Sequence, residues 1–409
     1  MTMKSMDLKY FTFFIYMCLA IAPISDNALF DILKIASFGI YVVAVTFPAM
    51  KKNKFKITGL AYWYILFFLF AMSSYFWARY NKTGVFFYSK AMVQILANTF
   101  CIPLMIESEE DIYKIVKVTL YVLIFNIIVL LIKVPISQWG TERLGKSAGI
   151  EPNTVGIQMA YGALISFFFF WKSKKKNNLL LFILFVFIAL LSGSKKAIII
   201  IVLGILVLEF FYTNHKNIKQ TIMRAVFILV AIIATGYLIF NNATLYNVIG
   251  SRIERTTSYI LSKGDTFDNS TRERAYYISE AKFLFKNHPL VGVGLNNFQY
   301  YIGSIGYSHV AYSHNNYWEM LSCLGLVGTI LLYSMYFWLL YSLIRNGKSL
   351  KNNIGSLLLT LMLIFTICDY LHISYKGILQ FALISIVYCY NRQLYKKGED
   401  INESSKEIN

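Results

Sequence analysis

Charged residues are scarce in this sequence. Asp, Glu, Lys and Arg together make up only 15% of its 409 residues, whereas 57% are hydrophobic and 17% are aromatic. A soluble domain carries about 25% charged residues and has shorter apolar runs. The sequence therefore lacks the polar surface of an ordinary soluble protein. It predicts an all-α, polytopic membrane protein, because long apolar runs cross bilayers as helices.

Acidic residues are the scarcer of the charged kinds, with 21 Asp and Glu against 39 Lys and Arg. The resulting net charge of +18 could indicate nucleic-acid binding. The basic residues, however, cluster in short loops after the second, sixth, tenth and twelfth apolar runs, as expected for loops that face the cytoplasm. We therefore predict no nucleic-acid partner and place both termini in the cytoplasm.

Cysteine is also rare, and its five copies all lie within apolar runs without a CxxC pair. The sequence therefore predicts neither a disulfide framework nor a thiolate metal site. No group of His, Asp and Glu residues has the spacing of metal ligands. We expect a site without a metal ion or other cofactor. The first apolar run lacks a signal cleavage site and is predicted to be a membrane span.

Twelve apolar runs approach the roughly 20 residues that a membrane span requires. They cover residues 8–24, 28–49, 57–77, 84–106, 112–134, 153–172, 178–193, 196–213, 221–241, 315–344, 353–371 and 375–391. The chain then divides into spans one to nine within 1–241, an extracytoplasmic loop at 242–314, spans ten to twelve within 315–391, and a cytoplasmic tail at 392–409. We expect the polar tail to be disordered from Lys396 onward.

The loop at 242–314 is much longer than any other connection, and loops of this length are usually functional or disordered. Its composition is not of low complexity. Residues 271–285 repeat apolar side chains at helical spacing, which predicts an amphipathic helix. The apolar positions are Ile278, Ala281, Leu284 and Phe285. We expect this loop to cap the membrane domain on its outer side.

The junction between this loop and the tenth span contains His314. At about 100° per residue, His314, Trp318, Gly325 and Gly328 would share one helical face. The two glycines would leave that face bare, so that another helix or a lipid chain could approach it closely. By itself, such a histidine is better explained as an ordinary interfacial side chain, because few such positions are catalytic.

Two motifs follow one another around this junction. The first is HPLVGVG at 288–294, followed by Phe298; the second is His-Asn, nine residues, Gly, two residues and Gly, starting at His314. In this order they resemble the signature of the O-antigen ligase and polymerase superfamily. The resemblance is clearest over residues 140–330. It implies a GT-C-like fold with about twelve transmembrane helices and one large outer loop.

The resemblance also implies a function, since this superfamily contains Wzy-type polysaccharide polymerases and lipopolysaccharide ligases. We expect a metal-independent, inverting glycosyltransferase that polymerises undecaprenyl-pyrophosphate-linked repeat units on the outer face of the bacterial cytoplasmic membrane. The product would be a capsular, exo- or O-antigen polysaccharide. Expected partners are the lipid-linked glycan, membrane lipids and assembly proteins such as a flippase or a chain-length regulator.

Two other functions remain open. A ligase of the same superfamily would move a finished glycan onto lipid A core or a protein, and the motifs do not separate it from a polymerase. A polysaccharide transporter with twelve helices would show internal repeats, and we find no convincing similarity between the two halves of the chain.

Two arginines of the outer loop are candidates for holding the pyrophosphate. Arg274 aligns best with the family's loop arginine, and Arg272 takes that role if the register differs by two residues. The planar fork of a guanidinium suits paired phosphate oxygens. Without the resemblance, surface pairs with Glu273 or Glu280 would explain both arginines. Arg274 and His314 form the predicted catalytic pair, in which the histidine orients and deprotonates the acceptor hydroxyl.

Lys195 and Lys196, at the start of the eighth span, form a second cationic site. The predicted topology puts them outside, against the positive-inside pattern. The free N–H groups of that span favour an anion, and Ser194 is expected to cap it. The family usually has Ser-Arg here, so Lys195 is the conservative match; snorkelling to the headgroups is the alternative. Substrate binding is also predicted for Asn315 and for Asn153, which is expected to cap the sixth span.

Arg143 and Lys146, in the same outer loop as Asn153, are cationic reserves for the site. Lys90 in the fourth span, and Asp369 and His372 at the outer end of the eleventh span, stay outside the predicted site because no family motif includes them. A carboxylate just inside a span is nevertheless a functional candidate by default.

Overall fold

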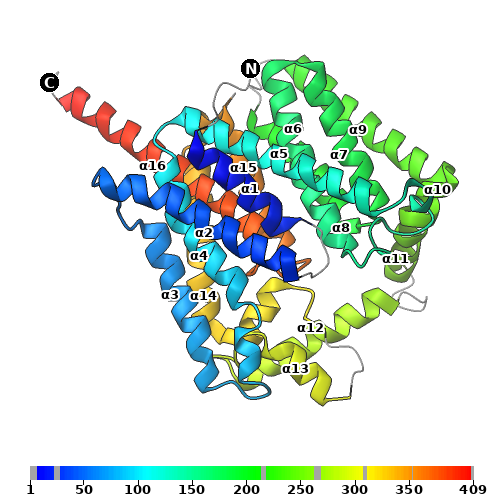
Figure 1. Cartoon of the computed structure of the whole chain (residues 1–409). Helices are drawn as coiled ribbons and strands as arrows, with labels where there is room; N and C mark the ends of the chain where they lie inside the picture. The colour runs from blue at the N-terminus through cyan, green and yellow to red at the C-terminus, as the bar shows by residue number, and fades with distance from the viewer. Residues whose placement is uncertain are drawn as a thin grey trace. The chain divides into compact units, whose positions relative to one another are not determined.

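The computed structural model describes residues 7–22, 28–212, 218–261, 269–306, 311–351 and 353–406, and over these ranges the chain is helical without a β-strand (Figure 1). Within them, each of the twelve predicted apolar runs overlaps a helix, and only α16 extends far beyond its run. These helices are α1 (Leu8–Ile21), α2 (Ala28–Lys51), α3 (Gly59–Ser73), α4 (Ser89–Met105), α5 (Glu109–Lys133), α6 (Pro152–Ser173), α7 (Lys176–Leu191), α8 (Lys195–Tyr212), α9 (Ile218–Asn241), α14 (Asn316–Arg345), α15 (Ile354–Cys368) and α16 (Ile378–Lys406).

Several of these helices can cross a membrane. Among the described residues, five helical segments are both long and apolar enough: α2, Gly59–Phe76, α5, α6 and α14. The helices α1, α7 and α15 are apolar but shorter. The chain is therefore a multi-pass helical membrane protein, while the count of twelve spans stays a prediction.

The prediction of a disordered tail from Lys396 is wrong for most of that segment. Helix α16 continues through the polar residues as far as Lys406. Lys and Glu are good helix formers, and extending an existing helix avoids the unfavourable nucleation step.

The helices divide into two compact units that interleave along the chain. The first unit comprises Met1–Ser37, Tyr113–Asp268 and Asn346–Ile364, and the second comprises Phe38–Ile112, Asn269–Arg345 and Phe365–Asn409. In the first unit α6 packs against both α7 and α8. Gly162 and Gly204 allow this, because a Cβ at either position would lie 2.5 Å from Phe185 or Leu164. In the second unit α14 packs against α3, α12 and α16, and α4 packs against α3 and α16.

Four α-helices occupy the described part of the predicted outer loop, with a π-helix at Tyr246–Gly250 between the first two. They are α10 (Ala243–Leu245), α11 (Ser251–Leu261), α12 (Asn269–Asn287) and α13 (Asn297–Ser304). Helix α12 confirms the predicted helix over 271–285. Its buried stripe contains the predicted Ala281 and Leu284 together with Tyr277, whereas Ile278 and Phe285 are half-buried at its edges.

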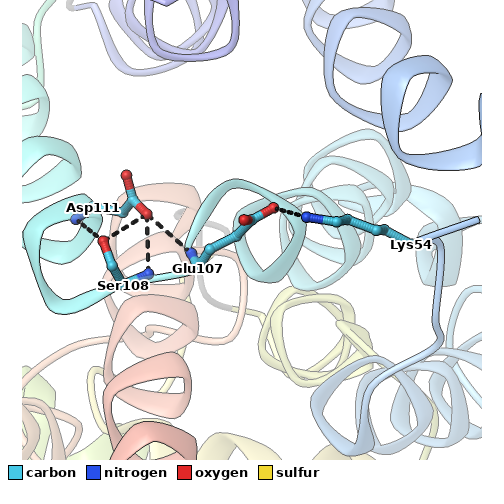
Figure 2. A network of polar contacts seen from close by, with 4 residues as sticks. All are labelled: Lys54, Glu107, Ser108 and Asp111. Carbon is cyan, nitrogen blue, oxygen red and sulfur yellow. Dashed lines mark hydrogen bonds and ion pairs between the residues drawn. The ribbon is translucent and has the colours of Figure 1, made fainter. Parts of the chain in front are cut away.

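A capping box starts α5 (Figure 2). The Asp111 carboxylate accepts the N–H groups of Glu107 and Ser108 at 3.1 and 3.0 Å, and Ser108 Oγ accepts the Asp111 N–H at 3.3 Å. These bonds satisfy donors that the first helical turn leaves open. Lys54, after α2, forms an ion pair with Glu107 at 3.0 Å. Both side chains are exposed, so the pair contributes at most about 1 kcal/mol.

Candidate functional site

Helix α14 is interrupted at Gly325, whose φ of 62° and ψ of −164° are not helical. Residues 289–294 lie against this interruption and hydrogen-bond to the backbone on both sides of it. The bonds run from Leu326 N–H to Pro289 O (2.8 Å), Val327 N–H to Leu290 O (3.1 Å), Val293 N–H to Ser322 O (3.0 Å) and Gly294 N–H to Cys323 O (2.8 Å). The two family motifs therefore dock on each other, and each satisfies backbone groups that the other leaves open.

Two glycines make this docking possible. A Cβ on Gly325 would lie 2.3 Å from the carbonyl atoms of Leu290, and a Cβ on Gly292 would lie 2.4 Å from the carbonyl carbon of Cys323. Both glycines also have positive φ angles, of 62° and 65°. Any side chain would both strain the backbone and separate the two segments.

The predicted bare glycine face from His314 to Gly328 is wrong. His314 precedes the helix, which begins at Asn316, and Gly325 interrupts it. The chain's own segment 289–294 covers Gly325, while a Cβ on Gly328 would meet Leu324 at 2.3 Å. The chain itself therefore fills the groove in which a lipid tail was expected.

His314 lies between two tyrosines at the start of α14. Its ring centroid is 4.1 Å from that of Tyr312 and 6.1 Å from that of Tyr277, whose ring is inclined to it by 23°. Tyr277 comes from α12, so the histidine meets the amphipathic loop helix directly. His314 has a φ of 58°, in the left-handed region that few non-glycine residues adopt. Such a conformation persists where the surrounding contacts determine it.

Asn315 and Asn316 fix the start of α14 after this turn. Asn315 is fully buried, and its Oδ1 caps the helix by accepting the Trp318 N–H at 3.1 Å. Its Nδ2 finds no acceptor among the residues that the structure describes. Asn316 Oδ1 accepts the N–H groups of Ser374 and Tyr375 at 3.0 and 3.3 Å. The unsatisfied Asn315 donor is the kind of buried group that calls for a further partner.

Asp369 forms a buried network with the start of α14. Its carboxylate is fully buried and accepts hydrogen bonds from Asn316 Nδ2 (3.3 Å), Tyr333 OH (2.9 Å) and Gln380 Nε2 (3.2 Å). Its own carbonyl accepts the Asn316 N–H at 2.7 Å. A carboxylate among apolar helices requires such donors, because burial without them costs several kcal/mol. The network ties the histidine turn to the end of α15.

The arginines lie on α12 at different angles from Tyr277. Arg274 precedes Tyr277 by three residues, which is about 60° around the helix, whereas Arg272 is about 140° away. Arg274 is half-buried and Arg272 is exposed. Arg274 is therefore the arginine next to Tyr277, on the side of α12 that faces His314.

Glu280, one of the two carboxylates that could form surface pairs with these arginines, accepts a hydrogen bond from Tyr301 of α13 at 2.6 Å. Burial and this bond raise the pKa of the Tyr301 hydroxyl, since both disfavour its anion. Glu280 therefore joins α12 to α13 within the second unit.

In the first unit, Arg143 connects two predicted elements of the site. Its Nε donates to Ser192 O at 3.0 Å and its Nη2 donates to Asn153 Oδ1 at 2.8 Å. The prediction that Asn153 caps α6 is wrong. Glu151 is the cap, accepting the Thr154 N–H, and Asn153 bridges Arg143 and Glu151 instead. A longer carboxylate side chain reaches the open N–H group, which frees the amide for the guanidinium.

The segment 192–196 packs tightly on α6. A Cβ on Gly156 would lie 2.5 Å from Ser192 Oγ. Ser194 is fully buried, and its Oγ has no partner in the described part of the chain, so the predicted side-chain cap on α8 is wrong. Lys195 Nζ donates to Thr256 Oγ1 of α11. Lys196 is only 6% exposed, which disagrees with snorkelling of that lysine to the headgroups.

The structure thus gathers the predicted residues into two groups. Asn153, Lys195 and Lys196 belong to the first unit, where Arg143 joins the loop before α6 to the segment before α8. The arginines of α12 and the His314–Asn315 turn belong to the second unit.

An O-antigen ligase family model matches residues 179–333. The family resemblance is confirmed. The matched region extends from α7 into α14 and includes both docked motifs, the arginines of α12 and the lysines of α8. It supports a membrane function of the ligase or polymerase type on lipid-linked glycans. No curated protein matches the chain.

Two functional candidates fall outside the matched domain, Asn153 and Asp369. The position of Asp369 within a span was the one sequence signal for its network. Its partners could not be found that way, because Asn316 and Tyr333 lie 53 and 36 residues away along the chain. Among the described residues, no three His, Cys, Asp or Glu side chains gather in a group that could hold a metal ion.

Proposed function

We propose that this protein is a polysaccharide polymerase that joins undecaprenyl-pyrophosphate-linked repeat units on the outer face of the bacterial cytoplasmic membrane. The observation that carries the proposal is the docking of residues 289–294 on the break in α14. This docking joins the two motifs on α14, the helix that begins directly after the His314 turn and packs against α12, which bears Arg274.

The proposed reaction is a single displacement that inverts the anomeric carbon and needs no metal. The acceptor hydroxyl oxygen forms the new glycosidic bond while the bond from the anomeric carbon to the pyrophosphate oxygen breaks. His314 takes the hydroxyl proton. Arg274 offsets the charge that develops on the departing undecaprenyl pyrophosphate.

Further substrate contacts are assigned to four side chains. The unsatisfied Asn315 Nδ2 supports a hydrogen bond to the substrate. Lys195, Lys196 and Asn153 are proposed to bind the pyrophosphate or the glycan. Arg272 remains the alternative to Arg274.

A ligase is the second candidate, because the matched family model is described as O-antigen ligase. Its acceptor would be lipid A core or a protein, and its donor a finished glycan. The same residues would then perform one transfer for each chain instead of many.

A deletion strain distinguishes these functions. For a polymerase, we expect carbohydrate gels of the deletion strain to show single repeat units, and the wild-type gene to restore the ladder of long chains. Long chains that remain on the undecaprenyl carrier in the deletion strain would contradict the polymerase and support the ligase. Wild-type chains at their final attachment would contradict both.

The two arginines can be separated by matched substitutions to lysine. Arg274→Lys should lower chain elongation about 10- to 100-fold, because lysine keeps the charge and loses the bidentate contact worth about 1.5–3 kcal/mol. Arg272→Lys should have little effect, since Arg272 points away from Tyr277. Elongation is measured from gel ladders at matched membrane levels, with Lys286→Ala on α12 as the surface control. If only Arg272→Lys lowered chain elongation, Arg272 and not Arg274 would be the arginine that contacts the pyrophosphate.

A further inference from the structure

A buried carboxylate that the proposed reaction does not use holds the turn that presents His314. Glu319 lies in the first turn of α14 and is only 1% exposed. Its Oε2 accepts the Ser313 N–H at 2.9 Å. The side chain therefore reaches back over the start of its own helix to the residue before the histidine.

Glu319 contacts both neighbours of His314. While its carboxylate binds the Ser313 N–H, its own N–H donates to Asn315 O at 2.9 Å. Ser313 Oγ donates to that same carbonyl at 2.8 Å, which closes the turn. Ser313 and Asn315 are fully buried, so no water replaces these bonds. His314 is the one half-buried residue of this turn, held at a φ of 58°.

We propose that Glu319 is a positioning residue for His314. By accepting the Ser313 N–H it fixes the left-handed turn and thereby sets the imidazole against Tyr312 and Tyr277. This inference rests on the proposed function, in which His314 takes the acceptor proton. Small displacements of such a group are costly, since a shift of about 1 Å can lower a rate about 100-fold.

The requirement is for a hydrogen-bond acceptor at the right distance. The Ser313 N–H is a neutral donor, which an amide carbonyl can satisfy as well as a carboxylate. The charge of Glu319 has a separate interaction, with Lys376, whose Nζ lies 3.6 Å from the ring centroid of Tyr88. Substitutions of Glu319 can therefore distinguish the effect of side-chain length and hydrogen-bond acceptance from the effect of its negative charge.

Three variants of the full-length protein test this. Glu319→Gln keeps the acceptor and the length, Glu319→Asp keeps the charge but is one methylene shorter, and Glu319→Leu keeps the size without an acceptor. Each is purified in detergent and treated with diethyl pyrocarbonate, and the modification rates of His314 and His288 are followed by mass spectrometry. Elongation is measured in the deletion strain at matched membrane levels.

In Glu319→Asp and Glu319→Leu we expect diethyl pyrocarbonate to modify His314 faster than in the wild type, and His288 at the wild-type rate. Both variants should elongate chains about 100-fold more slowly. Glu319→Gln should match the wild type in both assays. Wild-type modification and elongation in the Asp and Leu variants would overturn the proposal. So would a Gln variant as impaired as the Asp variant, because charge would then be what matters.

The modification rate also separates this inference from the proposed function. If removal of the imidazole leaves elongation intact while Glu319→Asp still exposes His314 to the reagent, Glu319 positions the turn as inferred and the catalytic role of His314 fails. If removal of the imidazole stops elongation and the Glu319 variants change neither assay, the positioning role alone fails.

Discussion

His314→Asn is expected to lower glycan elongation about 100-fold or more while the protein still reaches the membrane. General acid–base catalysis contributes about 10²–10⁴-fold, and asparagine cannot take the acceptor proton at neutral pH. Asparagine is chosen because it tolerates the left-handed conformation that His314 adopts, with φ of 58°. The change therefore removes the imidazole without opposing the turn. The readout is the gel ladder of the complemented deletion strain.

His314→Ala provides the comparison, because alanine lacks the imidazole and also disfavours the left-handed region by about 1–2 kcal/mol. We expect both variants to be inactive. An active Asn variant beside an inactive Ala variant would show that the turn matters and the imidazole does not, which would remove His314 from the reaction. Lys286→Ala, on the exposed side of α12, should retain the wild-type ladder.

The helices were predictable because each carries a local signal. Each of the twelve apolar runs overlaps a helix in the described ranges, and the apolar spacing located α12. The prediction of a disordered tail was wrong because the local signal was misleading. The polar composition from Lys396 suggested disorder, although the same residues are good helix formers when a helix already leads into them.

The histidine turn could not be predicted from spacing. A glycine such as Gly325 can indicate close packing on a continuous helix, or a backbone conformation that other residues do not adopt. The sequence alone does not distinguish these two interpretations. Residues 289–294 determine the conformation at Gly325, because their N–H and carbonyl groups hydrogen-bond to the interrupted helix. The motifs include the residues that dock, while the docking itself depends on contacts between segments distant in sequence.

The polar networks could not be predicted either, because they too depend on contacts that form only in the folded chain. Glu319 and Asp369 are ordinary acidic residues in the sequence, and their roles depend on Ser313 and Asn316, which each reaches in the folded chain. Conversely, Asn153 was correctly marked as polar and local to α6, but its competition with Glu151 for the cap is decided by side-chain reach.

Gly325→Ala is expected to have the largest effect on stability, because it opposes the docking in two ways. Its φ and ψ of 62° and −164° lie in a region that is essentially open to glycine alone, and the new Cβ would lie 2.3 Å from the Leu290 carbonyl. We expect a loss of about 2–4 kcal/mol, seen as a lower thermal unfolding midpoint in detergent and reduced elongation. Gly303→Ala in α13 is the matched control, since nothing lies within 4 Å of its Cβ position.

A double-mutant cycle with Gly292→Ala tests whether the two family motifs act as one structural element. Gly292 faces Cys323 across the same docked backbone that Gly325→Ala disrupts. Once either substitution separates the segments, the other loses its clash partner, so the combined loss should fall below the sum of the single losses by about 0.5–3 kcal/mol. Strictly additive losses would show that the two glycines stabilise the protein independently. The docked segments would then not act as one cooperative element.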